Sequence, residues 1–160
     1  MVFIGMAFGS PMAASLTDRL QSYTAVMKGS SLITSILFFI IALSSYMPFY
    51  VVYVLLFLAG FAIGGQVLCF TSAKDNSALE MSGTTIAFTN ALVMMSGIIF
   101  QPLLGGLLDV FWSGQIAENG LRIYDQSAYQ MAIIALPISL FFSWYLLRFV
   151  RETYAQDHHS

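Results

Sequence analysis

The sequence predicts an all-α integral membrane protein, a helical bundle of four full transmembrane helices plus a partial first helix. Of its 160 residues, 58% are hydrophobic and only 9% are charged, whereas a soluble domain carries about 25% charged residues. The charged residues also cluster, so that long uncharged runs separate them. Within these runs apolar residues follow one another without the alternation typical of barrel strands. Because only helices and closed barrels satisfy backbone polar groups in hydrocarbon, helices are the predicted spanning elements.

The longest uncharged run covers residues 29–73 and predicts two spans. One helical crossing needs about 20 mostly apolar residues, so these 45 residues hold two crossings. Pro48 suits the first turn of a new helix, where its missing N–H would be unpaired anyway. We therefore expect spans at 29–46 and 49–72. The stretch 32–43 has mostly Ser and Thr as polar groups, which can bond to their own backbone, and we expect it to face lipid.

Two further uncharged runs predict one span each, at 82–108 and 127–149. The run at the N-terminus is shorter and contains Pro11, so residues 2–16 are predicted to form only part of a spanning helix. Together these segments make a single membrane domain over residues 1–160.

Two prolines and one dipeptide predict local departures from straight helices. Pro102 and Pro137 lie inside predicted spans, where a proline removes a backbone hydrogen bond and bends the helix. The longest polar loop is 109–125, and it contains Asn119-Gly120, a strong signal for a type I′ turn. We therefore expect a small hairpin over residues 115–124.

The basic residues predict which side of the membrane each loop faces. If the first loop is cytoplasmic, successive loops alternate, and the cytoplasmic side holds five basic residues against one, as the positive-inside rule requires. The five are Arg19, Lys28, Lys74, Arg148 and Arg151, and the one is Arg122. This predicts a multi-pass protein of the cell inner (plasma) membrane, with the lipid bilayer as its surroundings and a cytoplasmic C-terminus.

Several classes of function are not expected. The net charge of −2 provides no basic surface for nucleic acid. The single cysteine, Cys69, lies in an apolar run, so a disulfide framework is excluded. The sequence shows no nucleophile–base pair, paired carboxylates or phosphate-binding loop, so we expect neither an enzyme nor a bound cofactor. His158 and His159 are adjacent in the tail and do not by themselves make a metal site.

Several stretches, in this order and spacing, resemble the C-terminal half of a bacterial major facilitator superfamily transporter. Residues 9–19, which end in Asp18-Arg19, look like the end of helix 8 and the family's signature loop before helix 9. The copy is degenerate, because Ala14 replaces the signature glycine and the basic residues that normally follow are missing. Residues 83–90 and 100–109 resemble helix 11. Residues 151–153, Arg-Glu-Thr, are similar to the usual exit of helix 12.

The resemblance implies transport of a small organic solute by an alternating-access secondary carrier. Such carriers have two six-helix halves with the substrate site between them. This chain would supply helices 9 to 12 and the end of helix 8, so its implied partners are the small-molecule substrate and an N-terminal half with helices 1 to 7. As a fragment it is not expected to be active alone. The alternative is a stand-alone four-helix membrane protein with an assembly or regulatory role.

A stripe of amide and small side chains is predicted along the helix at 82–108. Asn90 and Gln101 are eleven positions apart, which places them within about 20° of each other on an α-helix, and Met94 and Gly97 share that face. Amides inside an apolar helix avoid lipid. Two interpretations stay open, a face lining the transport path and hydrogen bonding to a neighbouring helix.

Gln66 and the pair Asp18 and Arg19 each have a functional and a structural interpretation. Gln66, beside Gly64-Gly65, would either contact substrate or bond to a neighbouring helix. In the family, the acidic group of the signature loop faces a helix N-terminus in the other half, so Asp18 and Arg19 would form a cytoplasmic latch. The alternative for that pair is an ordinary solvated loop. The GxxxG patterns at 5–9 and 60–64 predict close internal helix packing.

Overall fold

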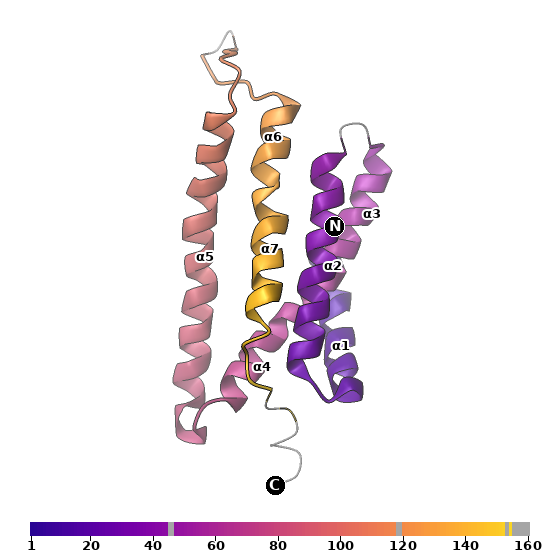
Figure 1. Ribbon diagram of the computed structural model, residues 1–160, viewed down its shortest axis with the longest axis vertical. Helices are drawn as coiled ribbons and strands as arrows, with labels where there is room; N and C mark the ends of the chain where they lie inside the picture. The colour runs from indigo at the N-terminus through magenta and orange to yellow at the C-terminus, as the bar shows by residue number, and fades with distance from the viewer. Residues whose placement is uncertain (45–46, 118–119, 153, 155–160) are drawn as a thin grey trace.

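The computed structural model describes residues 1–44, 47–117, 120–152 and Tyr154, and it is a bundle of long helices (Figure 1). Within this part of the chain the only β-structure is one isolated bridge. The helices and 3₁₀ turns, in chain order, are α1 (Val2–Leu20), α2 (Tyr23–Leu43), α3 (Phe49–Ile63), η1 (Gly64–Val67), α4 (Leu68–Asp75), η2 (Leu79–Met81), α5 (Ser82–Val110), α6 (Gln126–Ile133) and α7 (Ala135–Leu146).

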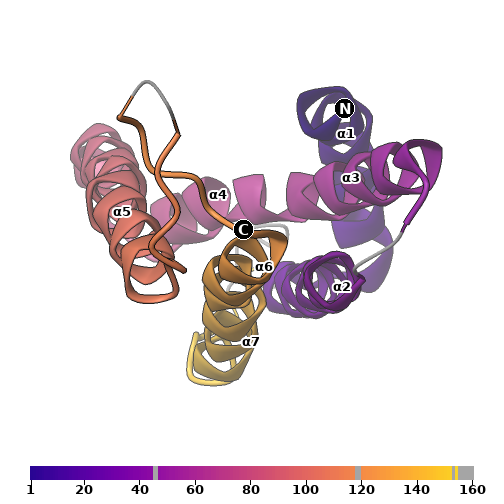
Figure 2. The same cartoon turned by 90° about the horizontal axis from the view of Figure 1, so that it is seen from above.

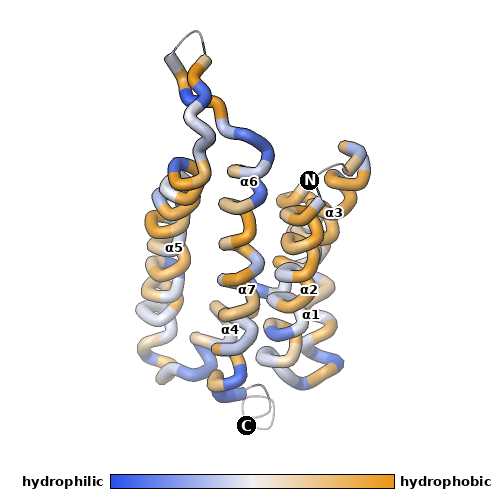
Figure 3. The backbone as a smooth tube through the Cα atoms, turned by 45° about the horizontal axis from the view of Figure 1, so that its top comes forward, coloured by the Kyte–Doolittle hydropathy of each residue, from blue (hydrophilic) through white to orange (hydrophobic). Residues whose placement is uncertain are grey.

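Four segments are long and apolar enough to cross a membrane, which confirms the predicted helical class and the number of full spans. They are Tyr23–Leu43, Phe49–Asp75, Leu79–Val110 and Gln126–Leu146. The 19-residue α1 is outside this set. Figure 3 shows hydrophobic residues along the helices and hydrophilic residues gathered toward the two ends of the bundle. This is the distribution that a bilayer imposes on a multi-span protein.

The chain connections alternate between the two ends of the bundle (Figure 1). We call one the basic end; there α1 turns into α2, α4 meets α5, and the chain continues beyond α7. We call the other the hairpin end, because it carries residues 111–125. The five basic residues predicted to share one side all belong to segments at or near the basic end.

The turn between α1 and α2 is much shorter than the sequence predicts. The expected boundaries were 2–16 and 29–46, but α1 continues to Leu20 and α2 already begins at Tyr23. Gln21 reverses the chain with a left-handed backbone (φ 51°), and the Ser22 side chain accepts a hydrogen bond from the Ala25 N–H at 3.1 Å. Uncharged runs of sequence mark only the apolar part of a helix. They therefore do not include the turns at the helix ends that carry charged residues.

The backbones of α1 and α3 touch through glycines. A Cβ atom on Gly5 or Gly9 would collide with carbonyl oxygens of α3, and a Cβ atom on Gly60 would collide with the carbonyl oxygen of Val2. A Cβ atom on Gly64 would likewise collide with backbone atoms of Gly9 and Ser10. The two GxxxG patterns therefore face each other within one chain, which confirms the predicted internal packing.

Helix α2 lies between α1, α3 and α7, and one of its faces is fully packed. Ser30, Ser31, Thr34 and Ser35 are buried along that face. The expectation that this segment faces lipid is therefore wrong for its hydroxyl face, because small side chains let neighbouring helices approach closely. Its large apolar residues, such as Ile36, remain on the exposed side.

The local departures predicted at Pro102, at Pro137 and in the loop 109–125 have different outcomes in the structure. The last span breaks at Ile134, between α6 and α7, three residues before Pro137, whereas α5 runs uninterrupted through Pro102. The predicted hairpin is present as an antiparallel bridge between Ile116 and Arg122. Gly120 in its turn has φ +80°, and Asn119 is outside the described residues.

Helix α5 stands apart from the tightly packed helices. It packs on α4 near the basic end and on α6 near the hairpin end, and none of its residues is buried. Seen from above, α4 leads away from α3 toward α5, while α1, α2 and α3 stay together (Figure 2). The protein thus combines a close three-helix group with one open helix.

We predict that Gly9→Ala and Gly60→Ala destabilise the protein by about 1–3 kcal/mol each, the usual cost of overpacking. Each added methyl would meet backbone atoms, which cannot swing aside as a side chain can. Thermal unfolding of the detergent-purified protein measures the effect. Gly97→Ala is the matched control, because a Cβ there meets nothing within 4 Å. Equal loss in all three variants would show that the α1–α3 contact has no special role.

Candidate functional site

A set of hydrogen bonds at the basic end ties the C-terminal segment to the start of α2. The Glu152 carboxylate accepts from the backbone N–H groups of Tyr23 (3.1 Å) and Thr24 (3.0 Å). It also accepts from the hydroxyls of Ser22 (2.5 Å) and Thr24 (2.7 Å). The first N–H groups of a helix have no partner within the helix, and the positive end of the helix dipole favours an anion there. Glu152 therefore caps α2 from a distant part of the chain.

Tyr154 completes this arrangement. Its ring packs edge-on against Tyr23 with centroids 5.1 Å apart, and its hydroxyl donates to the Asp18 carboxylate at 3.0 Å. Only 5% of Tyr154 is exposed, and its N–H donates to Glu152 at 3.2 Å. We call Asp18, Ser22, Thr24, Glu152 and Tyr154 the C-terminal clamp. The clamp joins the end of α1, the start of α2 and the segment after α7.

The electrostatics of the clamp favour an ionised Glu152. Partial burial alone would raise the pKa of this carboxyl, but hydrogen bonds from Ser22, Thr24 and Tyr154 outweigh burial and lower the pKa from 4.5 to about 2. Burial and the hydrogen bond to Asp18 together raise the pKa of the Tyr154 phenol, so it keeps its proton at neutral pH.

The structure places the predicted latch pair, Asp18 and Arg19, at the end of α1. Asp18 bonds to Tyr154 of the same chain. Arg19 is exposed and makes no ion pair among the described residues. The acidic group at a helix N-terminus within this chain is Glu152, which the sequence reasoning missed. Ser22 marks the start of α2, since Ser is a favoured N-cap residue, but it does not indicate that Glu152 bonds there.

Gln66 lies in η1, the 3₁₀ turn within the span Phe49–Asp75. Short 3₁₀ stretches inside a helix often mark a hinge. Two neighbouring glycines hold this turn, because Gly64 lies against Gly9 of α1 and Gly65 against the Ser30 hydroxyl of α2. The Gln66 side chain is half-buried and makes no hydrogen bond within the described part of the chain.

The other path candidates all lie on α5. Asn90, Met94 and Gln101 are exposed and Gly97 is half-exposed. Neither amide side chain has a hydrogen bond to any residue that the structure describes. The rise of an α-helix separates the two amides by about 16 Å along the axis. Since η1 packs on α1, α2, α3 and α4, the structure does not bring Gln66 together with this stripe.

A second polar cluster fastens the hairpin to the end of α5. Arg122 forms an ion pair with Asp109 at 2.7 Å, and the Tyr124 hydroxyl donates to the same carboxylate at 2.5 Å. The Arg122 guanidinium also lies 4.8 Å from the ring centre of Trp112. Exposed pairs of this kind stabilise little individually, so we assign this cluster a local role in shaping the loop.

Among the residues that the structure describes, no three His, Cys, Asp or Glu side chains gather closely enough to hold a metal ion. Comparison of the chain with protein-family models, with curated proteins and with solved structures found no match. The amides of α5, the 3₁₀ turn at Gln66 and the C-terminal clamp are the features on which a function can be argued.

We predict that Glu152→Gln lowers the thermal unfolding midpoint at pH 7 by an amount equivalent to about 1 kcal/mol, the usual value of a helix N-cap. Folding lowers the pKa of Glu152, so its carboxylate stabilises the protein above pH 4.5, and this stabilisation is lost as the pH falls toward 2. The Glu152→Gln variant should therefore lack the part of the stability loss between pH 4.5 and pH 2 that comes from protonation of Glu152.

Glu80→Gln is the control, because Glu80 is an exposed carboxylate at the same end that makes no hydrogen bond among the described residues. It should behave like the unmodified protein between pH 7 and pH 2. An acid profile of Glu152→Gln that matches those of the control and the unmodified protein would contradict the capping role.

Proposed function

We propose that this chain is the C-terminal part of a major facilitator superfamily secondary carrier that moves a small organic solute by alternating access. Four helices suited to crossing a membrane support the membrane part of this proposal. The order of the family-like stretches supports the rest. In this proposal α2, the α3–α4 span, α5 and the α6–α7 span correspond to helices 9 to 12, and α1 to the end of helix 8.

The observation that carries the proposal is the open amide face of α5. Helix α5 belongs to the span Leu79–Val110, and none of the residues in the most apolar part of this span is buried. Asn90 and Gln101 nevertheless project from one face of it. An amide facing hydrocarbon without a partner is costly, so such residues face a water-filled cavity or another helix. A translocation path bordered by α5 provides both water and a facing half of the transporter.

Gln66 has a second role in the proposal. A short 3₁₀ stretch within a helix often marks a functional hinge, and η1 is such a stretch in the span Phe49–Asp75, where Gln66 lies. We propose that Gln66 contacts the solute from the α3–α4 side and that Asn90 and Gln101, about 16 Å apart on α5, contact it at successive positions along the path. The facing surface would come from an N-terminal half with helices 1 to 7, without which the cycle between inward- and outward-open states is incomplete.

The proposal also fixes the placement of the chain in the membrane. The five-to-one distribution of basic residues puts the basic end and the C-terminus in the cytoplasm of a bacterial cell, with the protein in the inner membrane. The C-terminal clamp would then hold the cytoplasmic ends of α1 and α2 together during transport. No Asp, Glu, Lys, Arg or His lies in the middle of a full span, so a proton-coupled cycle would take its titrating group from the other half.

We predict that cysteines replacing Asn90 and Gln101 react with a membrane-impermeant thiol reagent in cells that make the protein natively. The background is Cys69→Ser, which removes the only native cysteine. Both positions should react because water fills the proposed path. Labelling is measured on the isolated protein by mass shift.

Ile99→Cys is the matched control, since it lies opposite Asn90 on α5 by helical periodicity and is also exposed in the chain, at 57%. It should stay unlabelled because it faces lipid. Equal labelling of all three positions, or labelling of Ile99→Cys alone, would overturn the proposal. If none of the three reacts, α5 is covered by other helices, and the alternative of an assembly or regulatory protein gains support.

A further inference from the structure

A ladder of aromatic rings and one arginine runs down the last turns of α7 and beyond it. The rings of Phe141 and Trp144 are 5.2 Å apart, and those of Tyr145 and Phe149 are 5.7 Å apart. The Arg148 guanidinium lies over both pairs, 4.3 Å from the centre of Trp144 and 5.9 Å from that of Tyr145. Aromatic rings with a basic residue are typical of the membrane–water interface.

The Arg148 guanidinium has unused hydrogen-bonding capacity. It carries five N–H donors, and none of them bonds to a residue that the structure describes. Because it folds back over Trp144, it lies about one helical turn closer to the bilayer centre than its own backbone. The nearby carboxylate of Glu152 is engaged by α2, and Arg151 adds a second exposed cation. Among the described residues nothing occupies these donors, so an anion that approaches from the membrane side can bind them.

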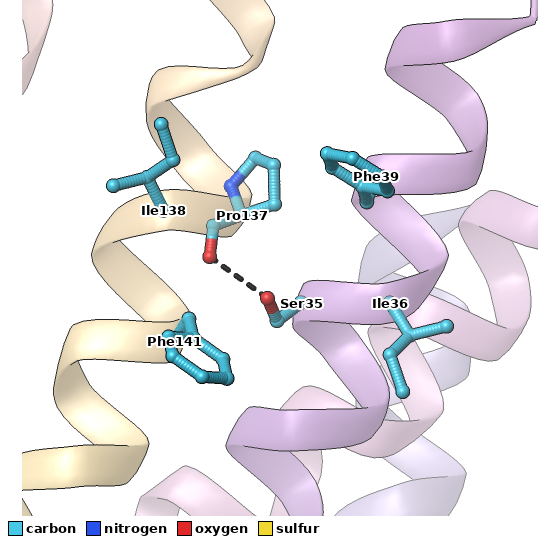
Figure 4. A pocket seen from close by; sticks show the side chains of 6 residues that line it. All are labelled: Ser35, Ile36, Phe39, Pro137, Ile138 and Phe141. Atoms are coloured by element: carbon cyan, nitrogen blue, oxygen red, sulfur yellow. Dashed lines mark hydrogen bonds between the residues drawn. The ribbon is translucent and has the colours of Figure 1, made fainter.

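An apolar pocket continues from this ladder toward the middle of the bundle. It lies between α2 and α7, has a volume of about 300 Å³, and is shown in Figure 4. Its lining residues are Ser35, Ile36, Phe39, Pro137, Ile138 and Phe141. The Ser35 hydroxyl donates to the Pro137 carbonyl at 2.8 Å, so the polar groups of the pocket satisfy each other. Phe141 belongs both to the pocket and to the ladder.

The length of this surface fits one leaflet of a bilayer. Pro137 and Arg148 are eleven residues apart, or roughly 16 Å along a helix, and half of the hydrocarbon core is about 15 Å thick. An acyl chain in the pocket would place its phosphate at the level of Arg148.

We propose that the groove between α2 and α7 binds one anionic phospholipid, with an acyl chain against the Pro137 pocket and the phosphate on Arg148. The guanidinium fork matches phosphate geometry, and its positive charge favours an anionic over a zwitterionic headgroup. This binding does not depend on transport, and it would hold the last span and α2 together at the lipid-facing surface.

The test uses the fluorescence of Trp144 in the full chain, with Trp112→Phe removing the other tryptophan. The protein is placed in phosphatidylcholine nanodiscs that contain a minor fraction of lipid brominated on the acyl chain, either phosphatidylglycerol or phosphatidylcholine. We expect the brominated phosphatidylglycerol to be about fivefold more effective as a quencher, the preference that one cation near the membrane surface provides. Arg148→Gln should abolish the preference, and Arg148→Lys should keep most of it.

Arg19→Gln is the control, because it removes an exposed arginine at the same end of the bundle that makes no ion pair with any described residue. It should retain the preference. Equal quenching by both lipids in the unmodified protein, or an unchanged preference in Arg148→Gln, would overturn the proposal. Loss of the preference when soluble glycerol phosphate is added would also overturn the proposal, because it would indicate a site for a free anion. Absence of quenching by either lipid would mean that another helix or a second copy covers the groove, which also overturns it.

Discussion

Backbone contact between α1 and α3 is the interaction on which the rest of the bundle depends. Lipid offers no hydrophobic driving force between helices, so close van der Waals packing has to hold them together. Gly5 and Gly9 on one helix and Gly60 and Gly64 on the other allow that approach. The buried hydroxyl face of α2 then packs against this pair. Backbone hydrogen bonds stay inside each helix, as hydrocarbon demands.

The same contact decides where the bundle opens. The close packing of α3 ends at η1, where Gly64 and Gly65 still touch α1 and α2. Beyond η1 the chain leads away through α4 to α5, which has no buried residue. The bundle therefore consists of a tight group of helices and one open helix with an amide stripe, along which we propose the path. At the basic end Glu152 and Tyr154 bind the start of α2 to the end of the chain.

The sequence predicts the spans well because charge in hydrocarbon is costly. The same signal is silent on helix ends, so it missed the first turns of α2, where Lys28 follows a capped N-terminus. Side-chain chemistry also failed to predict which face of α2 packs on other helices, because Ser and Thr occur on both lipid-facing and packed helix faces. Glu152 was missed for a different reason. A cap supplied from about 130 residues away depends on tertiary structure, and no local pattern encodes it.

Hydrogen–deuterium exchange in lipid nanodiscs tests directly whether a tightly packed group stands beside an open, water-facing helix. Peptides from α1 and α3 should exchange slowly, because their backbones are in mutual contact and away from water. Peptides from the middle of α5, around Asn90 and Gln101, should exchange at least severalfold faster. Equal protection of α3 and α5 would contradict the division of the bundle and the path proposed along α5.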